Sequence, residues 1–387
     1  MIDARRTSSS GIGRYTFCLL EALSSWEHLA KFDIYALGPS VAGISHVTWV
    51  PFEEPLLYPW QRSSLPDLLQ KIRGDVMIAP QYYIPSDLSI PVIRVLHDAH
   101  PFWDGYQSPR PEVFERVYDF SNIVEMAHRV SYRWNPTKEV GDRSVAELIQ
   151  HMYKYVCDAG EKIVTVSEFS SLDLCRYVTP LGGVDFNYPY IPNSLRKDLA
   201  DVGLRGRSKS TILMVAKVEP RKRHLDLISA VDKVRLDTGR DLQLVLIGGD
   251  TASFPEYAAR VRELASTHAW VENPGQVSDE TLAAWLKRAG LVVFPSMSEG
   301  FGFPALEAME TGAPLLAAAG TSLPEICGDA AYFFDEYRVS LEVAVLNALA
   351  HMESESEVDV LRRKQRAESF SLPSFAQGWS KFIEEVL

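Results

Sequence analysis

The chain has 387 residues, of which 46% are hydrophobic and 23% are charged, and this composition excludes wholesale disorder. Its net charge of −12 excludes a basic nucleic-acid-binding module, because binding a phosphate backbone requires a concentrated positive field. We therefore expect no nucleic-acid partner. A small anionic ligand held by a few local cations is compatible with the composition.

The cysteines and the hydropathy pattern indicate in which cellular compartment the protein works. The four cysteines, Cys18, Cys157, Cys175 and Cys327, show no paired spacing and no zinc-binding pattern, which is typical of a reducing environment. Apolar runs fall far short of the ~20 residues of a membrane span, and the first residues lack the apolar stretch of a signal peptide. We expect a cytoplasmic protein. Peripheral attachment at the inner membrane surface stays open, as does a longer native N-terminus.

Short apolar runs alternate with helical patterns along the chain, which is typical of parallel sheets covered by helices. The predicted strands of the first half are residues 33–37, 76–79, 92–96 and 162–166, after a first strand that ends at residues 2–4. In the second half, strands are predicted at 211–216, 243–247 and 291–294, and helices at 225–233, 257–268 and 278–288. The fold class predicted is α/β, with two Rossmann-like domains facing a cleft and ligands beyond the carboxyl ends of the strands.

A polar, Gly-containing linker at residues 196–210 separates the two halves. The predicted domains are residues 1–200 and 201–370, followed by a helix at 371–387 with aromatic residues at helical spacing. Residues 103–160 fit the strand–helix alternation poorly. They predict helices plus an excursion, either one that shapes a substrate entrance or a variable surface insertion.

The densest chemical signal is at residues 292–309, where a buried strand leads into a Gly-bearing loop and then a helix with Pro304 in its first turn. Backbone N–H groups at such a junction can bind an anion or sugar hydroxyls. Glu299 and Glu307 place two carboxylates, which accept hydrogen bonds from hydroxyl groups, beside those donors. A structural turn is the alternative if this junction is considered alone.

The spacing of Glu299 and Glu307 resembles the E-x7-E element of retaining glycosyltransferases with the GT-B fold, in glycosyltransferase family four (the mannosyltransferase-like, group 1 type). Further segments resemble the family's other motifs in the same order along the chain. These segments are residues 10–15, 95–98, 165–170, 191–194, 218–223, 275–284 and 320–325.

The resemblance implies a retaining, metal-independent glycosyltransferase without a cofactor. Such an enzyme moves a sugar, first of all mannose from GDP-mannose, to a glycan or lipid-linked acceptor in surface polysaccharide biosynthesis. The first domain would bind the acceptor and the second the nucleotide-sugar donor, and the terminal helix would cross back to the first domain. Two alternatives stay open: a GT-B nucleotide-sugar epimerase and a non-catalytic subunit that binds nucleotide sugars.

The resemblance also assigns roles to residues. Lys222 would neutralise the diphosphate as it leaves, Glu299 would bind a hydroxyl of the donor sugar, and Glu307 would bind the ribose hydroxyls. His97 would lie near the reacting carbon, with Asp98 holding its imidazole tautomer. The implied catalytic residues are thus His97, Glu299 and Lys222. The implied donor-binding residues are Gly11, Gly13, Lys217, Arg221, Lys222, Gly300, Phe301, Gly302, Phe303 and Glu307.

Two features qualify these assignments. Gly11 and Gly13 have no Cβ, so that backbone could approach a diphosphate, but an ordinary tight turn is the alternative. Ala216-Lys217 stands where many family members have Gly-Arg, and lysine keeps the charge but not the guanidinium fork. No metal site is expected, because the chain has no Asp-x-Asp pattern and its cations could supply the charge stabilisation.

Overall fold

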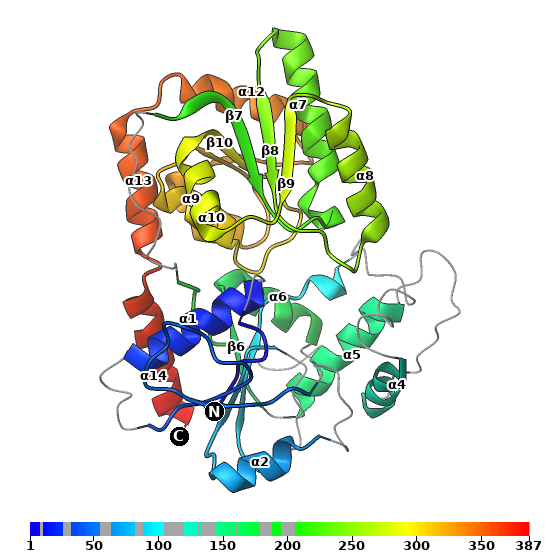
Figure 1. Ribbon diagram of the computed structural model, residues 1–387, viewed down its shortest axis with the longest axis vertical. Helices are drawn as coiled ribbons and strands as arrows, with labels where there is room; N and C mark the ends of the chain where they lie inside the picture. The colour runs from blue at the N-terminus through cyan, green and yellow to red at the C-terminus, as the bar shows by residue number, and fades with distance from the viewer. Residues whose placement is uncertain are drawn as a thin grey trace. The chain divides into compact units, whose positions relative to one another are not determined.

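The computed structural model contains two compact units, one formed by Met1–Ser194 with Ser371–Leu387 and the other by Leu195–Phe370. Each unit is a parallel sheet with helices packed against it (Figure 1). The structure describes residues 1–7, 11–25, 32–54, 63–81, 88–103, 120–130, 132, 144–159, 161–178, 188–194 and 206–386. Ser10, residues 133–136 and most of the predicted linker lie outside the described residues.

The first unit contains a six-stranded parallel sheet in the order β3-β2-β1-β4-β5-β6. The strands are β1 (Ile2–Asp3), β2 (Tyr35–Leu37), β3 (Thr48–Val50), β4 (Met77–Ala79), β5 (Val92–Leu96) and β6 (Lys162–Thr165). Every residue of β4 and β5 is buried, as expected for parallel strands covered on both faces. These central strands therefore present only their carboxyl ends as places for a ligand.

Helices complete the first unit. They are α1 (Gly11–Ser25), α2 (Leu65–Ile72), the 3₁₀ turn η3 (His100–Phe102), α4 (Phe120–Arg129), α5 (Ser144–Asp158), α6 (Glu168–Val178) and α14 (Leu372–Val386). The terminal helix α14 lies beside α1 (Figure 1). Its Phe375 packs edge-on against Tyr15 of α1, with ring centroids 5.5 Å apart, and its Trp379 is fully buried. The last segment of the chain is thus part of the first unit's core.

The described parts of residues 103–160 also belong to the core. Ile123 of α4 and Leu148 of α5 are fully buried in one cluster with Leu96 and Ile163 of the sheet. A variable surface insertion is therefore wrong for these two helices, because their apolar faces fill the side of the sheet next to β5 and β6.

The second unit repeats the architecture with a six-stranded parallel sheet in the order β12-β11-β10-β7-β8-β9. Its strands are β7 (Ser208–Val215), β8 (Gln243–Ile247), β9 (Val271–Gly275), β10 (Ala289–Phe294), β11 (Leu315–Ala318) and β12 (Tyr332–Phe334). Its helices are η4 (Pro220–Lys222), α7 (His224–Thr238), α8 (Pro255–Ser266), α9 (Asp279–Arg288), α10 (Phe303–Glu310), α11 (Leu323–Cys327), η5 (Gly328–Ala330), α12 (Leu341–Met352) and α13 (Glu357–Glu368).

Local sequence explains where helices of the second unit begin and end. The side chain of Ser278 caps α9 by accepting a hydrogen bond from the backbone of Thr281, and acidic residues fill the first turn while basic residues fill the last. At α13, Ser356 and Asp359 form a reciprocal capping box. α7 ends at Gly239, whose φ of +69° suits glycine.

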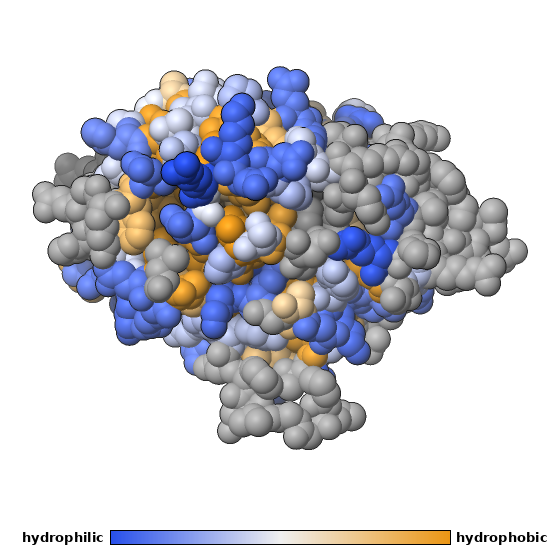
Figure 2. Space-filling view, turned by 90° about the horizontal axis from the view of Figure 1, so that it is seen from below, coloured by the Kyte–Doolittle hydropathy of each residue, from blue (hydrophilic) through white to orange (hydrophobic). Residues whose placement is uncertain are grey.

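The two strand orders are equivalent: both are the doubly wound order, in which the chain adds strands on one side of the first strand and, from the fourth strand on, on its other side. This change of side, the reversal point, lies between β1 and β4 in the first sheet and between β7 and β10 in the second. Open α/β sheets bind ligands at this point, outside the carboxyl ends of the strands. The predicted α/β class with two Rossmann-like domains is confirmed. Figure 2 shows one face of the molecule, on which hydrophilic and apolar residues are interspersed.

Candidate functional site

The reversal point of the second sheet brings together the loops that follow β7 and β10. The backbone N–H of Met297, after β10, donates to the carbonyl of Arg221, after β7, at 2.9 Å. The two loops are therefore one unit of structure at the carboxyl edge of the sheet. Predicted site residues from both loops meet there.

Lys222 and Glu299 form an ion pair at this edge. The Nζ of Lys222 donates to Oε1 of Glu299, and each side chain is only 9% exposed. The ammonium also lies 5.3 Å from the centroid of the Phe294 ring at the end of β10. Burial, aided by the nearby Arg221, lowers the pKa of Lys222, while Glu299 opposes the shift. In this structure the predicted phosphate-binding cation and the predicted sugar-binding carboxylate satisfy each other.

Arg221 supports the same loop from the side. Its Nη1 donates to the carbonyl of Ser298 at 2.7 Å and lies 3.7 Å from Oε2 of Glu299, while its Nε donates to Glu219 at 2.9 Å. Glu299 therefore has a cation beside each of its carboxylate oxygens. Lys217, which directly follows Ala216 at the end of β7, is exposed.

The loop between β10 and α10 has a fixed shape. Gly302 adopts a φ of +100°, and a Cβ there would lie 2.8 Å from the side chain of Leu323, so only glycine fits. The side chain of Phe301 is buried and packs edge-on against Phe370, with ring centroids 5.5 Å apart. Because that ring is committed to the core, Phe301 can offer a ligand only its backbone. Gly300 and Phe303 complete the predicted loop on either side.

Glu307 lies in the second turn of α10 and is buried, at 8% exposure. The helix starts at Phe303 with Pro304 in its first turn, as the sequence predicts. Glu299 and Glu307 are therefore both nearly buried, one in the loop and one inside the helix that the loop starts.

Two residues without a predicted role hold the backbone of Glu299. The N–H of Glu299 donates to Oγ1 of Thr321 at 3.2 Å. The hydroxyl of Ser322 donates to the carbonyls of Glu299 at 2.9 Å and Phe301 at 3.2 Å. Residues 320–325 resemble a family motif, and this was the only signal that could have singled out these two hydroxyls.

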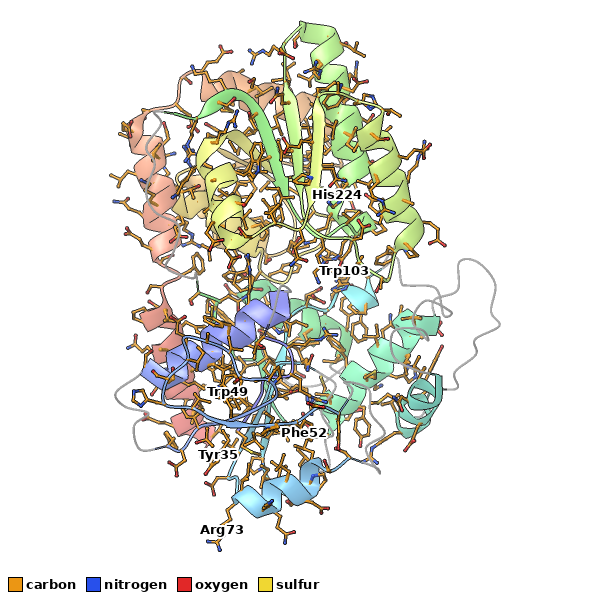
Figure 3. The ribbon with its side chains drawn as sticks, in the orientation of Figure 1. Tyr35, Trp49, Phe52, Arg73, Trp103 and His224 are labelled. Carbon is orange, nitrogen blue, oxygen red and sulfur yellow. The ribbon has the colours of Figure 1, made fainter. Side chains whose placement is uncertain are left out.

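His224 is a second residue without a predicted role. It starts α7 directly after Lys222 and Arg223, at the carboxyl end of β7 (Figure 3), and is 1% exposed. Its ring bonds to the backbone of Ala216, yet burial lowers its pKa to about 4. The ring is therefore neutral at pH 7 and adds no positive charge beside Lys222.

In the first unit, His97 follows the end of β5. Its Nε2 lies 2.9 Å from the carbonyl oxygen of Pro80, and its ring packs edge-on against Tyr15 with centroids 4.9 Å apart. Burial lowers the pKa of His97, so the neutral ring is favoured. Because a carbonyl only accepts, Nε2 carries the proton and Nδ1 keeps its lone pair.

Two details of the first unit differ from the sequence-based expectations. The hydrogen-bond partner of His97 Nε2 is Pro80, whereas Asp98 pairs with Nδ1 of His100 in the following 3₁₀ turn. Gly11 and Gly13 lie in the first turn of α1 rather than in a loop. A Cβ at Gly11 would meet no atom within 4 Å, so the position is open on that side.

The structure thus groups Lys222, Arg221, Glu299 and the 300–303 loop in the second unit, with Glu307 on the helix that follows. His97, Gly11 and Gly13 belong to the first unit. Among the described residues, no group of three or more His, Cys, Asp or Glu side chains could hold a metal ion. Over the same residues, no helix combines the length and apolar character needed to cross a bilayer.

Comparison with known proteins adds independent information on the second unit. Residues 197–366 match the family model described as glycosyl transferases group 1. This match lies within the second unit. The O-antigen chain mannosyltransferase B of Escherichia coli is 25% identical over 388 residues, which cover 94% of this chain and 92% of that protein.

Solved structures resemble the chain over nearly its whole length. The sucrose-phosphate synthase of Thermosynechococcus elongatus aligns with a TM-score of 0.71 at 16% identity, covering 100% of this chain and 98% of that one. Anabaena HepE, crystallised with UDP and glucose, aligns with a TM-score of 0.68 at 15% identity and covers 99% and 98%. At these identities the likeness shows the fold alone, and the predicted GT-B fold is confirmed.

Proposed function

We propose that the protein is a glycosyltransferase that takes a sugar from a nucleotide diphosphate donor and passes it to a glycan or lipid-linked acceptor. The observation that carries the proposal is the meeting of Lys222 and Glu299 at the reversal point of a doubly wound sheet. A cation suits a diphosphate and a carboxylate suits sugar hydroxyls. The match of the same unit to glycosyl transferases group 1 supports this assignment.

The donor end of the reaction is assigned to the second unit. Lys222, with Arg221 beside it, neutralises the charge that develops on the diphosphate as the glycosidic bond breaks, and no metal ion is required for this role. Glu299 accepts a hydrogen bond from a hydroxyl of the donor sugar. Backbone N–H groups near Phe301 to Phe303 assist Glu299 at the sugar, and Glu307 accepts hydrogen bonds from the ribose hydroxyls. Lys217, which is exposed, adds positive charge for the incoming donor.

The acceptor end is assigned to the first unit. Gly11 and Gly13, at the start of α1 in the same unit, are assigned to the donor instead, because helix N-terminal N–H groups can bind its phosphate oxygens. His97, neutral and protonated on Nε2, can accept a hydrogen bond at Nδ1 and so orient a hydroxyl near the reacting carbon. The sugar is transferred with retention of configuration, by attack of the acceptor on the same face from which the phosphate leaves.

The donor is assigned as GDP-mannose and the product as a surface polysaccharide. This finer assignment is supported by the relative from Escherichia coli, a mannosyltransferase of O-antigen chains. The reaction is placed in the cytoplasm, because all four cysteines are free thiols, as is usual in a reducing compartment.

Incubation of the purified protein with a panel of GDP-, UDP- and ADP-sugars and a mannosyl acceptor tests the proposal. Sugar transferred to the acceptor supports it, and the anomeric configuration of the new bond, read by NMR, tests retention. Conversion of the donor into its epimer would instead identify an epimerase. Binding without any turnover would identify a non-catalytic subunit.

A further inference from the structure

We propose that Thr321 and Ser322 are positioning residues that set the orientation of Glu299 toward the sugar of the donor, without contributing to binding of the nucleotide. The proposal rests on the proposed function, since it names what aligns one of its binding groups. It follows from contacts between the segment before α11 and the loop before α10.

These contacts hold the backbone of Glu299 on both sides. Thr321 accepts from its N–H at 3.2 Å, and Ser322 donates to its carbonyl at 2.9 Å. The same Ser322 hydroxyl reaches the carbonyl of Phe301 at 3.2 Å, so it ties together two carbonyls of one turn. Because the peptide groups on both sides of the Glu299 Cα are bonded, this segment sets the backbone and the direction of the Cα–Cβ bond, from which the carboxylate reaches Lys222 and Arg221.

A third residue of the same segment also packs against the loop that contains Glu299. The side chain of Leu323 fills the space that a Cβ of residue 302 would need, at 2.8 Å, so loop and segment fit only with Gly302. Three successive residues, 321 to 323, thus contact successive parts of the 299–302 loop. The loop therefore takes its shape from its own Gly302 together with this segment.

The backbone of Thr321 adopts a strained conformation, which indicates that the hydroxyl at this position has a role. Its φ is +58°, a left-handed conformation that β-branched residues rarely adopt. Glycine would adopt this conformation more readily, but it has no side-chain oxygen to accept from the N–H of Glu299. Non-glycine residues in such conformations cluster at functional sites, where the surrounding structure over-determines them.

The geometry separates sugar binding from nucleotide binding. Glu299 is held by Thr321 and Ser322, whereas Glu307 is part of α10 and is positioned by the helix itself. Lys222 belongs to the other loop, after β7. Loss of the two hydroxyls should therefore disturb recognition of the sugar and leave recognition of the nucleoside diphosphate in place.

The test compares Thr321→Val with Thr321→Ser, which restores the hydroxyl, and with Ser322→Ala. Thr311→Val is the matched control, because Thr311 is buried, as Ser322 is, and its hydroxyl donates to a carbonyl, that of Ala308 at 2.9 Å, away from the Glu299 loop. Titration calorimetry with GDP and GDP-mannose gives the two affinities. Transfer kinetics with GDP-mannose give kcat and KM, and UDP with UDP-glucose serves as a second ligand pair.

We expect Thr321→Val and Ser322→Ala each to lower kcat/KM about tenfold, roughly the effect of one lost hydrogen bond, and to remove the gain in affinity of GDP-mannose over GDP. The affinity for GDP itself should stay within about twofold of wild type, and Thr321→Ser should recover most of the activity.

Two results would overturn the positioning role while the proposed function stands: losses in Thr321→Val no larger than in Thr311→Val, or equal losses of GDP and GDP-mannose affinity in a protein that still transfers sugar. If the wild-type protein neither binds nor turns over any of the four ligands, the proposed function fails and this inference fails with it.

Discussion

Replacing Lys222 by alanine is the most direct test of the donor site. The lysine is 9% exposed on its side chain and pairs with Glu299 at the carboxyl edge of the second sheet. A cation about 4 Å from a leaving phosphate, at an effective dielectric constant near 20, is worth about 4 kcal/mol. Arg221 lies 3.7 Å from the same carboxylate and retains part of this stabilisation. We therefore expect the transition state to lose about 2 to 4 kcal/mol.

This loss corresponds to a decrease in kcat/KM of about 30- to 900-fold, at 1.36 kcal/mol for each factor of ten. Global stability should fall much less, by about 1 to 2 kcal/mol, because Arg221 remains beside the carboxylate of Glu299. Transfer kinetics with a nucleotide sugar measure the first quantity, and urea unfolding measures the second. Lys233→Ala is the matched control, since Lys233 is an exposed lysine that pairs with Asp237 on its own helix at 2.8 Å.

A Lys222→Ala variant with normal turnover would remove this residue from the mechanism. A loss of activity matched by the same fractional loss of folded protein would also contradict the reasoning. In that case Lys222 would serve the fold through its buried pair rather than the reaction.

Three further outcomes follow from the geometry. Glu307→Ala should weaken binding of GDP itself about tenfold, measured by calorimetry, and unchanged GDP affinity would refute the ribose assignment. His97→Ala should bind GDP-mannose as wild type does but lose transfer, so weakened donor binding would refute its acceptor-side role. Because burial lowers the pKa of His224 to about 4, its neutral form stabilises the fold above pH ~6.5, and this contribution of about 3 kcal/mol is lost as the pH falls from 6.5 through 4. Urea unfolding at pH 7.5 and 4.5 should show a smaller acid-induced loss in His224→Gln, and equal losses would contradict the shift.

Apart from β6, which is an edge strand, the strands that the sequence revealed lie inside the two sheets. β5 and β10 are continuous apolar runs buried on both faces, so their pattern is unambiguous. The missed strands carry weaker patterns. β3 is a half-exposed edge strand, and β9 is an edge strand that contains Pro274, which argues against a strand in sequence. β11 has four residues, of which two are alanines, so its composition does not indicate a buried strand.

The candidate site divides in the same way. Lys222 and Glu299 could be found from sequence, because each belongs to a motif with a fixed place after a strand. Their pairing could not, because the two residues are 77 positions apart and meet only when β7 and β10 become neighbours. Thr321 is likewise 22 positions from the backbone group it binds. Local sequence patterns indicate which side chains can bind a ligand or act in a reaction. The order of the strands in the sheet decides which of these side chains come into contact.

The ion pair between Lys222 and Glu299 has a consequence for how the proposed donor would bind. A diphosphate that takes Lys222 leaves the carboxylate of Glu299, at 9% exposure, without its closest partner. A sugar that bonds to Glu299 alone leaves the buried ammonium of Lys222 in the same position. Only a ligand with both groups, at the spacing of a nucleotide sugar, satisfies both ends of the broken pair at once. Binding of the intact nucleotide sugar should therefore be more favourable in free energy than the sum of the values for the nucleoside diphosphate and the sugar bound separately. Such a site would hold the uncleaved donor more tightly than the released nucleotide.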